Sequence, residues 1–200
     1  MNIYSSSQLD EIINELNKGN TVAFGTDTVF GLACITGNDE AINKIYEQKN
    51  RDKTKKLPMM FSNAKMMEKY IKIPPKAKTL IDAFSPGPIT YILEAIDSKE
   101  TIACRIPDDT WIIDLISKIG KPLYVTSANI SGENSLLKYE EVKEKVNADA
   151  IVKKDASGKR ASTIVDVINN FKILREGPIT ESQVKEAIKW KHYINTFILS

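Results

Sequence analysis

Apolar side chains recur at helical spacing near the start of the chain, at Leu9, Ile12, Ile13 and Leu16. This i, i+3, i+4, i+7 pattern ends at Gly19 and predicts an amphipathic helix of about three turns. Ser7 and Asp10 precede and open it in the spacing of a capping box, with Asp in place of Glu. Weaker helical patterns occupy residues 41–46, 63–71, 75–84, 111–119, 138–147 and 182–196.

Short apolar runs bounded by polar residues, Gly or Pro predict buried strands between these helices. They lie at residues 21–24, 29–33, 57–61, 89–95, 102–106, 123–126, 151–152, 163–167 and 173–174. Pro58 has no backbone N–H to give to a neighbouring strand, which favours an edge position for 57–61. Strands and helices alternate, yet several strands follow one another without a crossover helix. We therefore predict an α/β fold in a single domain, with a twisted sheet of mixed parallel and antiparallel strands flanked by helices.

Composition places the chain among globular proteins. Of its 200 residues, 42% are hydrophobic and 27% are charged, which excludes a disordered or collagen-like chain. No apolar run approaches the 18 or so residues of a membrane span, and the N-terminus has no signal-peptide pattern. The two cysteines, Cys34 and Cys104, are far apart and fit no metal-binding spacing. A reduced, cytoplasmic protein without membrane association is expected.

Positive charge is concentrated in one segment. The whole chain has a net charge of +2, but residues 44–78 contain eleven Lys or Arg against three Asp or Glu, a net of +8. Within it, Lys49, Arg51, Lys53, Lys55 and Lys56 lie close together, and we expect Lys49 and Arg51 to lie in a solvated loop. Such a loop could equally bind polyanions, either nucleotide phosphates or nucleic acid.

Several common active-site types are missing from the sequence. His192 is the single histidine, so a His-based catalytic triad or zinc site is not expected. Neither the G-x-x-x-x-G-K-[ST] phosphate loop nor the G-x-G-x-x-G dinucleotide motif occurs. No metal ligands are predicted.

Five polar clusters lie at the ends of predicted strands or helices, where functional sites are usually found. They are residues 26–28, residues 49–56, Thr101 with Arg105, residues 127–132, and Ser162-Thr163 with Arg175. Taken singly, each is typical of a turn or a helix cap. An inward-facing Arg105 on a strand would need an anionic partner. Together the clusters supply cations and small hydroxyls with no evident acid–base residue, which favours binding of a polyphosphate and a small carboxylate over covalent catalysis.

Seven short motifs, in order, resemble those of the YrdC/Sua5 family, the threonylcarbamoyl-AMP synthases of tRNA modification. They are Gly25-Thr-Asp-Thr-Val-Phe-Gly-Leu32, Lys49-Asn-Arg51, Pro86-Gly-Pro-Ile-Thr90, Arg105-Ile-Pro107, Ser127-Ala-Asn129, Ser162-Thr-Ile-Val-Asp166 and Ile173-Leu-Arg175-x-Gly177. The resemblance covers roughly residues 7–180. It implies a YrdC-like catalytic domain over residues 1–180, with residues 181–200 as a C-terminal helical extension on or beside it. The length implies the single-domain type.

The resemblance also implies the reaction of L-threonine, bicarbonate and ATP to threonylcarbamoyl-AMP and pyrophosphate, with Mg²⁺ accompanying ATP. Lys49 and Arg51 would be catalytic. ATP contacts would come from Lys49, Arg51, Lys55, Thr101, Asn129 and Arg175. L-threonine contacts would come from Thr28, Arg105, Ser127 and Ser162. A tRNA-modifying threonylcarbamoyl transferase complex would use the product.

Phe30, Met60 and Asp109 depart from the family pattern, since members often have Tyr, His and His there. Two other functional hypotheses stay open. The segment 44–78 could serve an RNA-binding or ribosome-maturation module, with weak RNA binding. The chain could also be a regulator that binds threonine or nucleotide without turnover.

Overall fold

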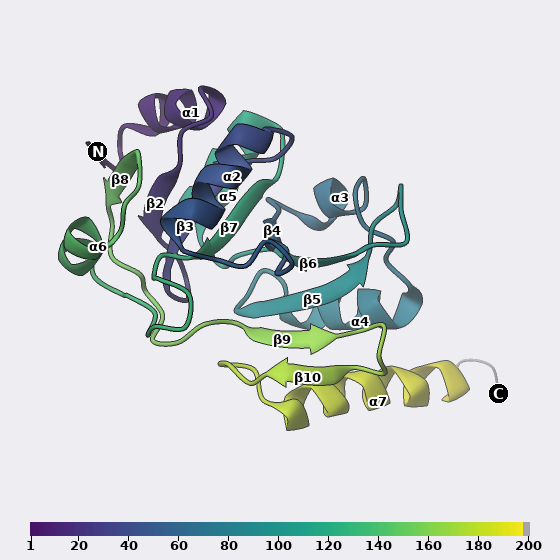
Figure 1. Ribbon diagram of the computed structural model, residues 1–200. Helices are drawn as coiled ribbons and strands as arrows, with labels where there is room; N and C mark the ends of the chain where they lie inside the picture. The colour runs from purple at the N-terminus through teal and green to yellow at the C-terminus, as the bar shows by residue number, and fades with distance from the viewer. Residues whose placement is uncertain (198–200) are drawn as a thin grey trace.

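The computed structural model describes residues 1–197, and in this part of the chain ten strands form one continuous sheet (Figure 1). Its order is β1-β8-β2-β3-β7-β4-β6-β5-β9-β10. The bounds are β1 Asn2–Ser5, β2 Val22–Gly25, β3 Phe30–Ile35, β4 Met59–Met60, β5 Ile89–Glu94, β6 Thr101–Arg105, β7 Leu123–Ser127, β8 Ala150–Lys153, β9 Thr163–Asp166 and β10 Lys172–Arg175. β8 pairs in parallel with β1 and β2, whereas β2–β3–β7 and β5–β6 are antiparallel. The predicted mixed sheet is therefore confirmed.

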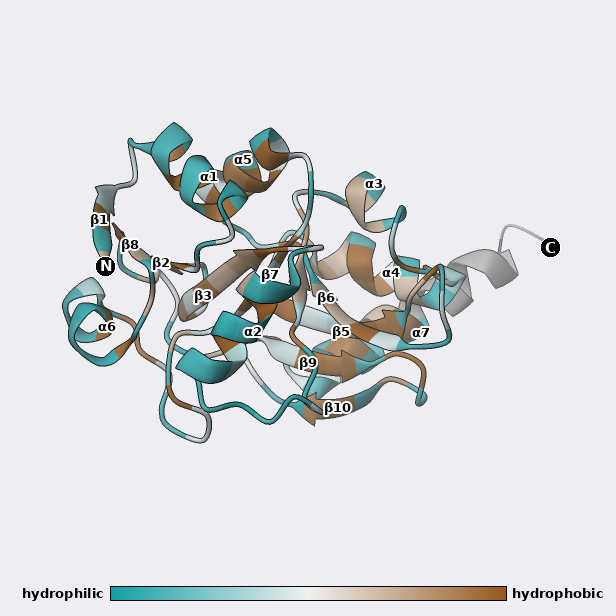
Figure 2. Ribbon diagram, turned by 45° about the horizontal axis from the view of Figure 1, so that its top comes forward, coloured by the Kyte–Doolittle hydropathy of each residue, from teal (hydrophilic) through white to brown (hydrophobic). Residues whose placement is uncertain are grey.

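Helices cover the sheet at the positions that periodicity predicted. They are α1 Leu9–Asn17, α2 Asp39–Gln48, α3 Ala64–Met67, α4 Pro75–Phe84, α5 Thr110–Ile119, α6 Tyr139–Lys145 and α7 Glu181–Phe197. Alternation along β2 explains the layers, because Val22 and Phe24 face α1 and α5 whereas Ala23 faces α2 and α6. Figure 2 shows β3 in hydrophobic brown and α2 and α6 largely in hydrophilic teal.

Two local predictions are wrong, and one strand was missed. β1 was not anticipated; it pairs along one side only, at the end of the sheet. The strand at 57–61 is not at an edge, since β4 lies between β7 and β6. Pro58 comes just before β4 and supplies only its carbonyl oxygen, which accepts a hydrogen bond from the Val125 N–H, so its missing N–H breaks no pairing. Ser7 does not cap α1, whose N-cap is Gln8.

The half of the sheet formed by β5, β6 and β9 is covered on one face only. Ile89, Tyr91 and Cys104 pack there against α3, α4 and α7, and Val184 of α7 joins the same core. The alternate positions point the other way, so Thr90 and Arg105 lie on the uncovered face. This uncovered face forms the floor of the pocket described below.

Truncation in the core should be costly where its matched control is not. Ile116 on α5 is fully buried between α1 and the sheet, whereas Ile168 is 43% exposed. Ile116→Ala should lower the free energy of unfolding by about 2–5 kcal/mol. Ile168→Ala should change it by less than about 0.5 kcal/mol. Urea denaturation of both variants checks this, and equal losses would contradict the assigned core.

Candidate active site

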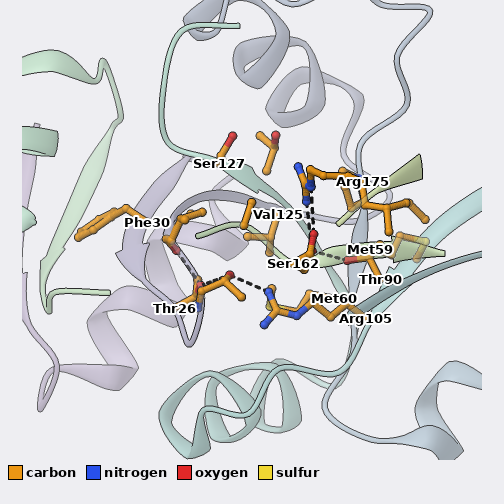
Figure 3. A pocket seen from close by; sticks show the side chains of 18 of the residues that line it. Thr26, Phe30, Met59, Met60, Thr90, Arg105, Val125, Ser127, Ser162 and Arg175 are labelled. Carbon is orange, nitrogen blue, oxygen red and sulfur yellow. Dashed lines mark hydrogen bonds between the residues drawn. The ribbon is translucent and has the colours of Figure 1, made fainter. Parts of the chain in front are cut away.

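A pocket of about 190 Å³ opens where the turn formed by Thr26, Asp27 and Thr28, the T-D-T turn, meets strands β4 to β7, β9 and β10. Its wall contains three arginines, six Thr or Ser hydroxyls and a set of apolar side chains. The lining residues are Thr26, Thr28, Val29, Phe30, Gly31, Arg51, Pro58, Met59, Met60, Thr90, Ala103, Arg105, Val125, Thr126, Ser127, Ala161, Ser162, Ile164 and Arg175. Figure 3 shows Arg105, Ser162 and Arg175 gathered on one side of it.

Arg105, at the end of β6, is buried, and its guanidinium is held on three sides. Its Nε donates to the Gly87 carbonyl at 3.0 Å, its Nη1 donates to the Thr28 hydroxyl at 2.9 Å, and its Nη2 forms an ion pair with Asp27. Burial lowers the pKa of Arg105, and the Asp27 carboxylate opposes that shift. The anionic partner predicted for an inward Arg105 is thus present, and it is Asp27.

The turn that carries Asp27 is rigidly built. The Thr26 hydroxyl donates to the Val29 carbonyl at 2.7 Å and accepts the Thr28 N–H at 3.0 Å. A second segment lies against it, since the Ser157 N–H donates to the Thr26 carbonyl at 2.9 Å. A Cβ at Gly158 would come within 2.4 Å of the Thr28 carbonyl oxygen, so only glycine fits this approach.

Arg175 is the second arginine over the floor of the pocket, and an irregularity in β10 aims it there. Ile173 pairs with Val165, yet Arg175 pairs with Ile164, because the register shifts between them. This bulge turns Arg175 to the pocket face although Ile173, two residues earlier, faces the core. Its Nε donates to the Ser162 carbonyl at 2.9 Å, and its Nη2 donates to the Ser162 hydroxyl at 3.2 Å (Figure 3). Ser162 in turn shares a 2.8 Å hydrogen bond with Thr90.

No carboxylate is paired with Arg175 in the part of the chain that the structure describes. Burial, and then the nearby charge of Arg105, lower the pKa of Arg175. A guanidinium that lines a pocket without an anionic partner is suited to bind one, because its planar fork matches carboxylate and phosphate oxygens.

Lys49 contradicts the expectation of a solvated loop. It follows the last turn of α2 and is only 3% exposed. Its Nζ donates to the carbonyl oxygens of Ser127 and Asn129 and, at 3.2 Å, to the Asn129 side-chain oxygen. Burial and the neighbouring Arg51 lower the pKa of Lys49 to about 8. The ammonium therefore lies beneath the pocket and is not among its lining groups.

The remaining predicted site residues divide between the pocket and its surroundings. Thr28, Arg51, Ser127 and Ser162 line it together with Arg105 and Arg175. Arg51 is half-buried, and its Nε donates to the Lys55 carbonyl at 2.9 Å. Lys55, Thr101 and Asn129 do not line the pocket. Thr101 begins β6, four residues and about 13 Å along the strand from Arg105.

Asp27 and Thr90 are functional candidates that were missed. The signal for Asp27 was its place between Thr26 and Thr28 in the first motif, together with an inward Arg105 that needs an anionic partner. Asp27 Oδ2 also accepts the Asp108 N–H at 3.1 Å, and Oδ1 is buried without a hydrogen-bond partner among the described residues. Thr90 had a signal too, since it alternates with the core residues Ile89 and Tyr91.

The pocket is suited to binding anions and placing them against each other. Its ionisable lining groups are arginines, and the remaining polar side chains are hydroxyls. The thiols are unsuited to nucleophilic attack, because burial raises the pKa of Cys34 to about 12 and raises that of Cys104 as well. Among the side chains that the structure describes, those of residues 1–189, no three His, Cys, Asp or Glu form a metal-binding group. The same residues include no helix long and apolar enough to cross a bilayer.

Comparison with known proteins identifies relatives over most of the chain. Residues 14–177 match the model of the Sua5–YciO–YrdC family, described as "Telomere recombination". The threonylcarbamoyl-AMP synthase of Vibrio parahaemolyticus is 29% identical over 181 residues, covering 84% of this chain and 98% of its own length. That of Bacillus subtilis is 34% identical over 187 residues, covering 86% of this chain and 54% of the relative.

A solved structure agrees in fold. Sua5 of P. abyssi, in complex with L-threonine, matches with a TM-score of 0.86 and 25% identity. The match covers 94% of this chain and 61% of the P. abyssi chain. This chain therefore spans about three fifths of that Sua5 and about half of the B. subtilis relative.

The burial of Lys49 predicts its effect on stability. Lys49→Met removes the donor of three hydrogen bonds and should lower the free energy of unfolding at pH 7 by about 1–3 kcal/mol. The matched control Lys53→Met, at an exposed lysine in the same basic segment, should change it by less than about 0.5 kcal/mol.

The same lysine should give a pH dependence of known sign. Its pKa is about 8 in the fold against 10.5 for an ordinary lysine, so between these values the unfolded chain binds more protons at this site. The stability of the wild type relative to Lys49→Met should therefore rise with pH, by about 2 kcal/mol from pH 7 to 9.5. Urea denaturation at both pH values measures this, and a constant difference would contradict the depressed pKa.

Proposed function

This chain belongs to the Sua5–YciO–YrdC family, and from that membership we propose that it makes L-threonylcarbamoyl-AMP and pyrophosphate from L-threonine, bicarbonate and ATP. In chemical class it would be a nucleotidyltransferase, because an adenylyl group moves from pyrophosphate to a carbamate oxygen. The observation that carries the proposal is the pocket itself. It brings three arginines together with hydroxyls, and its lining includes no base to activate those hydroxyls as nucleophiles, which suits a reaction between two anionic substrates.

The threonine site is proposed around Arg105. Thr28, Ser127 and Ser162 surround the same part of the pocket and could orient the ammonium and hydroxyl of the amino acid. A guanidinium has five N–H donors, and three of those of Arg105 are engaged with Asp27, Thr28 and Gly87. Two donors thus remain for the carboxylate. Met60 lines this pocket without a polar contact to offer, and no threonine contact is assigned to it.

The ATP site is proposed to extend from Arg175 toward the basic loop. Arg175 and Arg51 are the pocket arginines without a carboxylate partner in the described residues, so they are suited to phosphate oxygens. Lys55, Thr101 and Asn129 lie outside the pocket lining and would contact parts of the nucleotide that extend beyond it. Mg²⁺ would enter as part of the substrate MgATP, held by phosphate oxygens and water.

The proposed reaction depends on how the pocket positions its substrates. The threonine amine and bicarbonate form a carbamate, and a carbamate oxygen attacks the α-phosphorus of ATP. The bond from that phosphorus to the bridging oxygen breaks, and pyrophosphate leaves with the electron pair. Orientation of two bound reactants can supply about 7–11 kcal/mol of a barrier. Arg51 and Arg175 would offset the charge that develops on the phosphate oxygens.

The product would serve the threonylcarbamoyladenosine modification of tRNA, through transfer by a separate tRNA-modifying complex. Binding of RNA through the segment 44–78 is the weaker alternative. Lys49 in that segment is buried. Lys44, Lys56, Lys72 and Lys78 form ion pairs with carboxylates. The positive charge is therefore less available to a polyanion than the sequence suggests.

Pyrophosphate release tests the proposed reaction. With MgATP and bicarbonate, release should depend on L-threonine, and L-serine should support it less well because it lacks the methyl group. Release that is independent of threonine would overturn the proposal. No release, together with tight, salt-sensitive RNA binding, would overturn it in favour of the RNA module. Tight threonine binding with no release would instead favour the regulator.

Replacement of Arg105 by lysine should be far from conservative. A lysine ammonium cannot hold Asp27, Thr28 and Gly87 while presenting a fork to a carboxylate. Arg105→Lys should raise the KM for L-threonine at least tenfold, with a smaller effect on the KM for ATP. A near-normal KM for threonine in this variant would remove Arg105 from the carboxylate site.

A further inference from the structure

The buried ammonium of Lys49 lies under a segment that bears two proposed substrate contacts. Ser127 ends β7, and the chain then turns through Ala128 and Asn129. Lys49 Nζ donates to the main-chain oxygens of both Ser127 and Asn129 and to the Asn129 side chain. These three acceptors take up the three donors that a lysine ammonium has.

The rest of the segment is fixed by further hydrogen bonds. The Ser131 N–H donates to the Lys49 carbonyl at 3.0 Å, and the Ala128 N–H donates to the Phe30 carbonyl at 2.7 Å. The Ser127 hydroxyl donates to Asn129 Oδ1, the same oxygen that Lys49 holds. Asn129 Nδ2 then donates to the Glu133 carbonyl at 2.6 Å. Lys49 is thus the one charged group in this network.

We infer that Lys49 is a positioning residue, whose ammonium fixes the segment Ser127–Ser131 so that Ser127 and Asn129 face the substrates. This role rests on the proposed function and replaces the direct catalytic contact with ATP that the motif resemblance implied for Lys49. Arg51, two residues later, does line the pocket. The two cations of the motif therefore have different roles. Lys49 lies behind the pocket lining, and Arg51 faces the pocket.

The charge of Lys49 is needed because the acceptors it holds are all oxygens. Two carbonyl dipoles and an amide oxygen that converge on one point repel each other unless a cation lies between them. A neutral amine has only two donors and turns a lone pair toward the third oxygen. Deprotonation should therefore loosen the segment while the lysine side chain stays in place.

A double-mutant cycle separates positioning from direct contact. In threonine-dependent pyrophosphate release, Lys49→Met should lower kcat/KM for ATP at least tenfold. The double variant Lys49→Met/Asn129→Ala should lose at least tenfold less than the product of the two single losses, because both act through one segment. With Arg175→Met, which shares no contact with Lys49, the losses should multiply. Losses that also multiply with Asn129→Ala would overturn the inference.

The pH dependence of kcat/KM gives a second test, because a lysine with a purely structural role would not change it. Wild-type kcat/KM should fall above about pH 8, where Lys49 loses its proton, and Lys49→Met should lack this step. Arg51 is the charged group that acts on Lys49. Over the same range the stability that Lys49 contributes rises, so activity and stability should move in opposite directions. A profile that is unchanged in Lys49→Met would contradict the assigned role.

Hydrogen exchange tests the segment without any use of activity. In Lys49→Met the N–H groups of Ala128 and Ser131 should exchange at least tenfold faster, and Lys53→Met should leave them unchanged. If exchange responds but the wild type releases no pyrophosphate, the proposed function fails while the structural part of the inference stands. If the wild type is active and exchange does not respond, the positioning role itself is wrong.

Discussion

The guanidinium of Arg105 is buried where three separate parts of the chain meet, and burial of a charge is costly unless it is paired and hydrogen-bonded. Asp27 supplies the charge, Thr28 a hydroxyl and Gly87 a carbonyl. Asp27 and Thr28 belong to the T-D-T turn, and Gly87 belongs to the turn before β5. The hydrogen bonds of this one side chain on β6 therefore fix the T-D-T turn against the far half of the sheet. The pocket exists between these parts, and its shape depends on that fixed distance.

A second buried cation, Lys49, performs the same task at the turn after β7. Lys49 connects the end of α2 to the turn after β7, and through Ala128 that turn is also connected to β3. Arg105 and Lys49 therefore fix segments around the pocket. Arg105 keeps two donors for the threonine carboxylate, whereas Arg51 and Arg175 are left to meet phosphate oxygens. This division explains how a pocket without a nucleophile or a general base could still catalyse, since fixed donors need no reorganisation when charge develops.

Periodicity predicted the helices and most strands because their apolar faces are what the fold buries. Ile12 and Leu16 on α1 and Ile112 and Ile116 on α5 follow the helical spacing closely. Periodicity could not predict features that depend on partners distant in the sequence. The position of β4 inside the sheet is decided by β6 and β7, and the bulge that aims Arg175 is decided by pairing with β9. Six residues named from the motifs line one pocket. The burial of Lys49 could not be predicted in this way, because it depends on carbonyl groups 78 and 80 residues away.

The central claim is that the pocket joins threonine, bicarbonate and ATP in one product. Mass spectrometry of a reaction with ¹³C-bicarbonate tests it most directly. The account predicts a threonylcarbamoyl-AMP species whose mass is shifted by one carbon label, formed only when L-threonine and MgATP are both present, together with one pyrophosphate per product. Pyrophosphate formed alongside unlabelled AMP, with no labelled adduct even after rapid quenching, would contradict it.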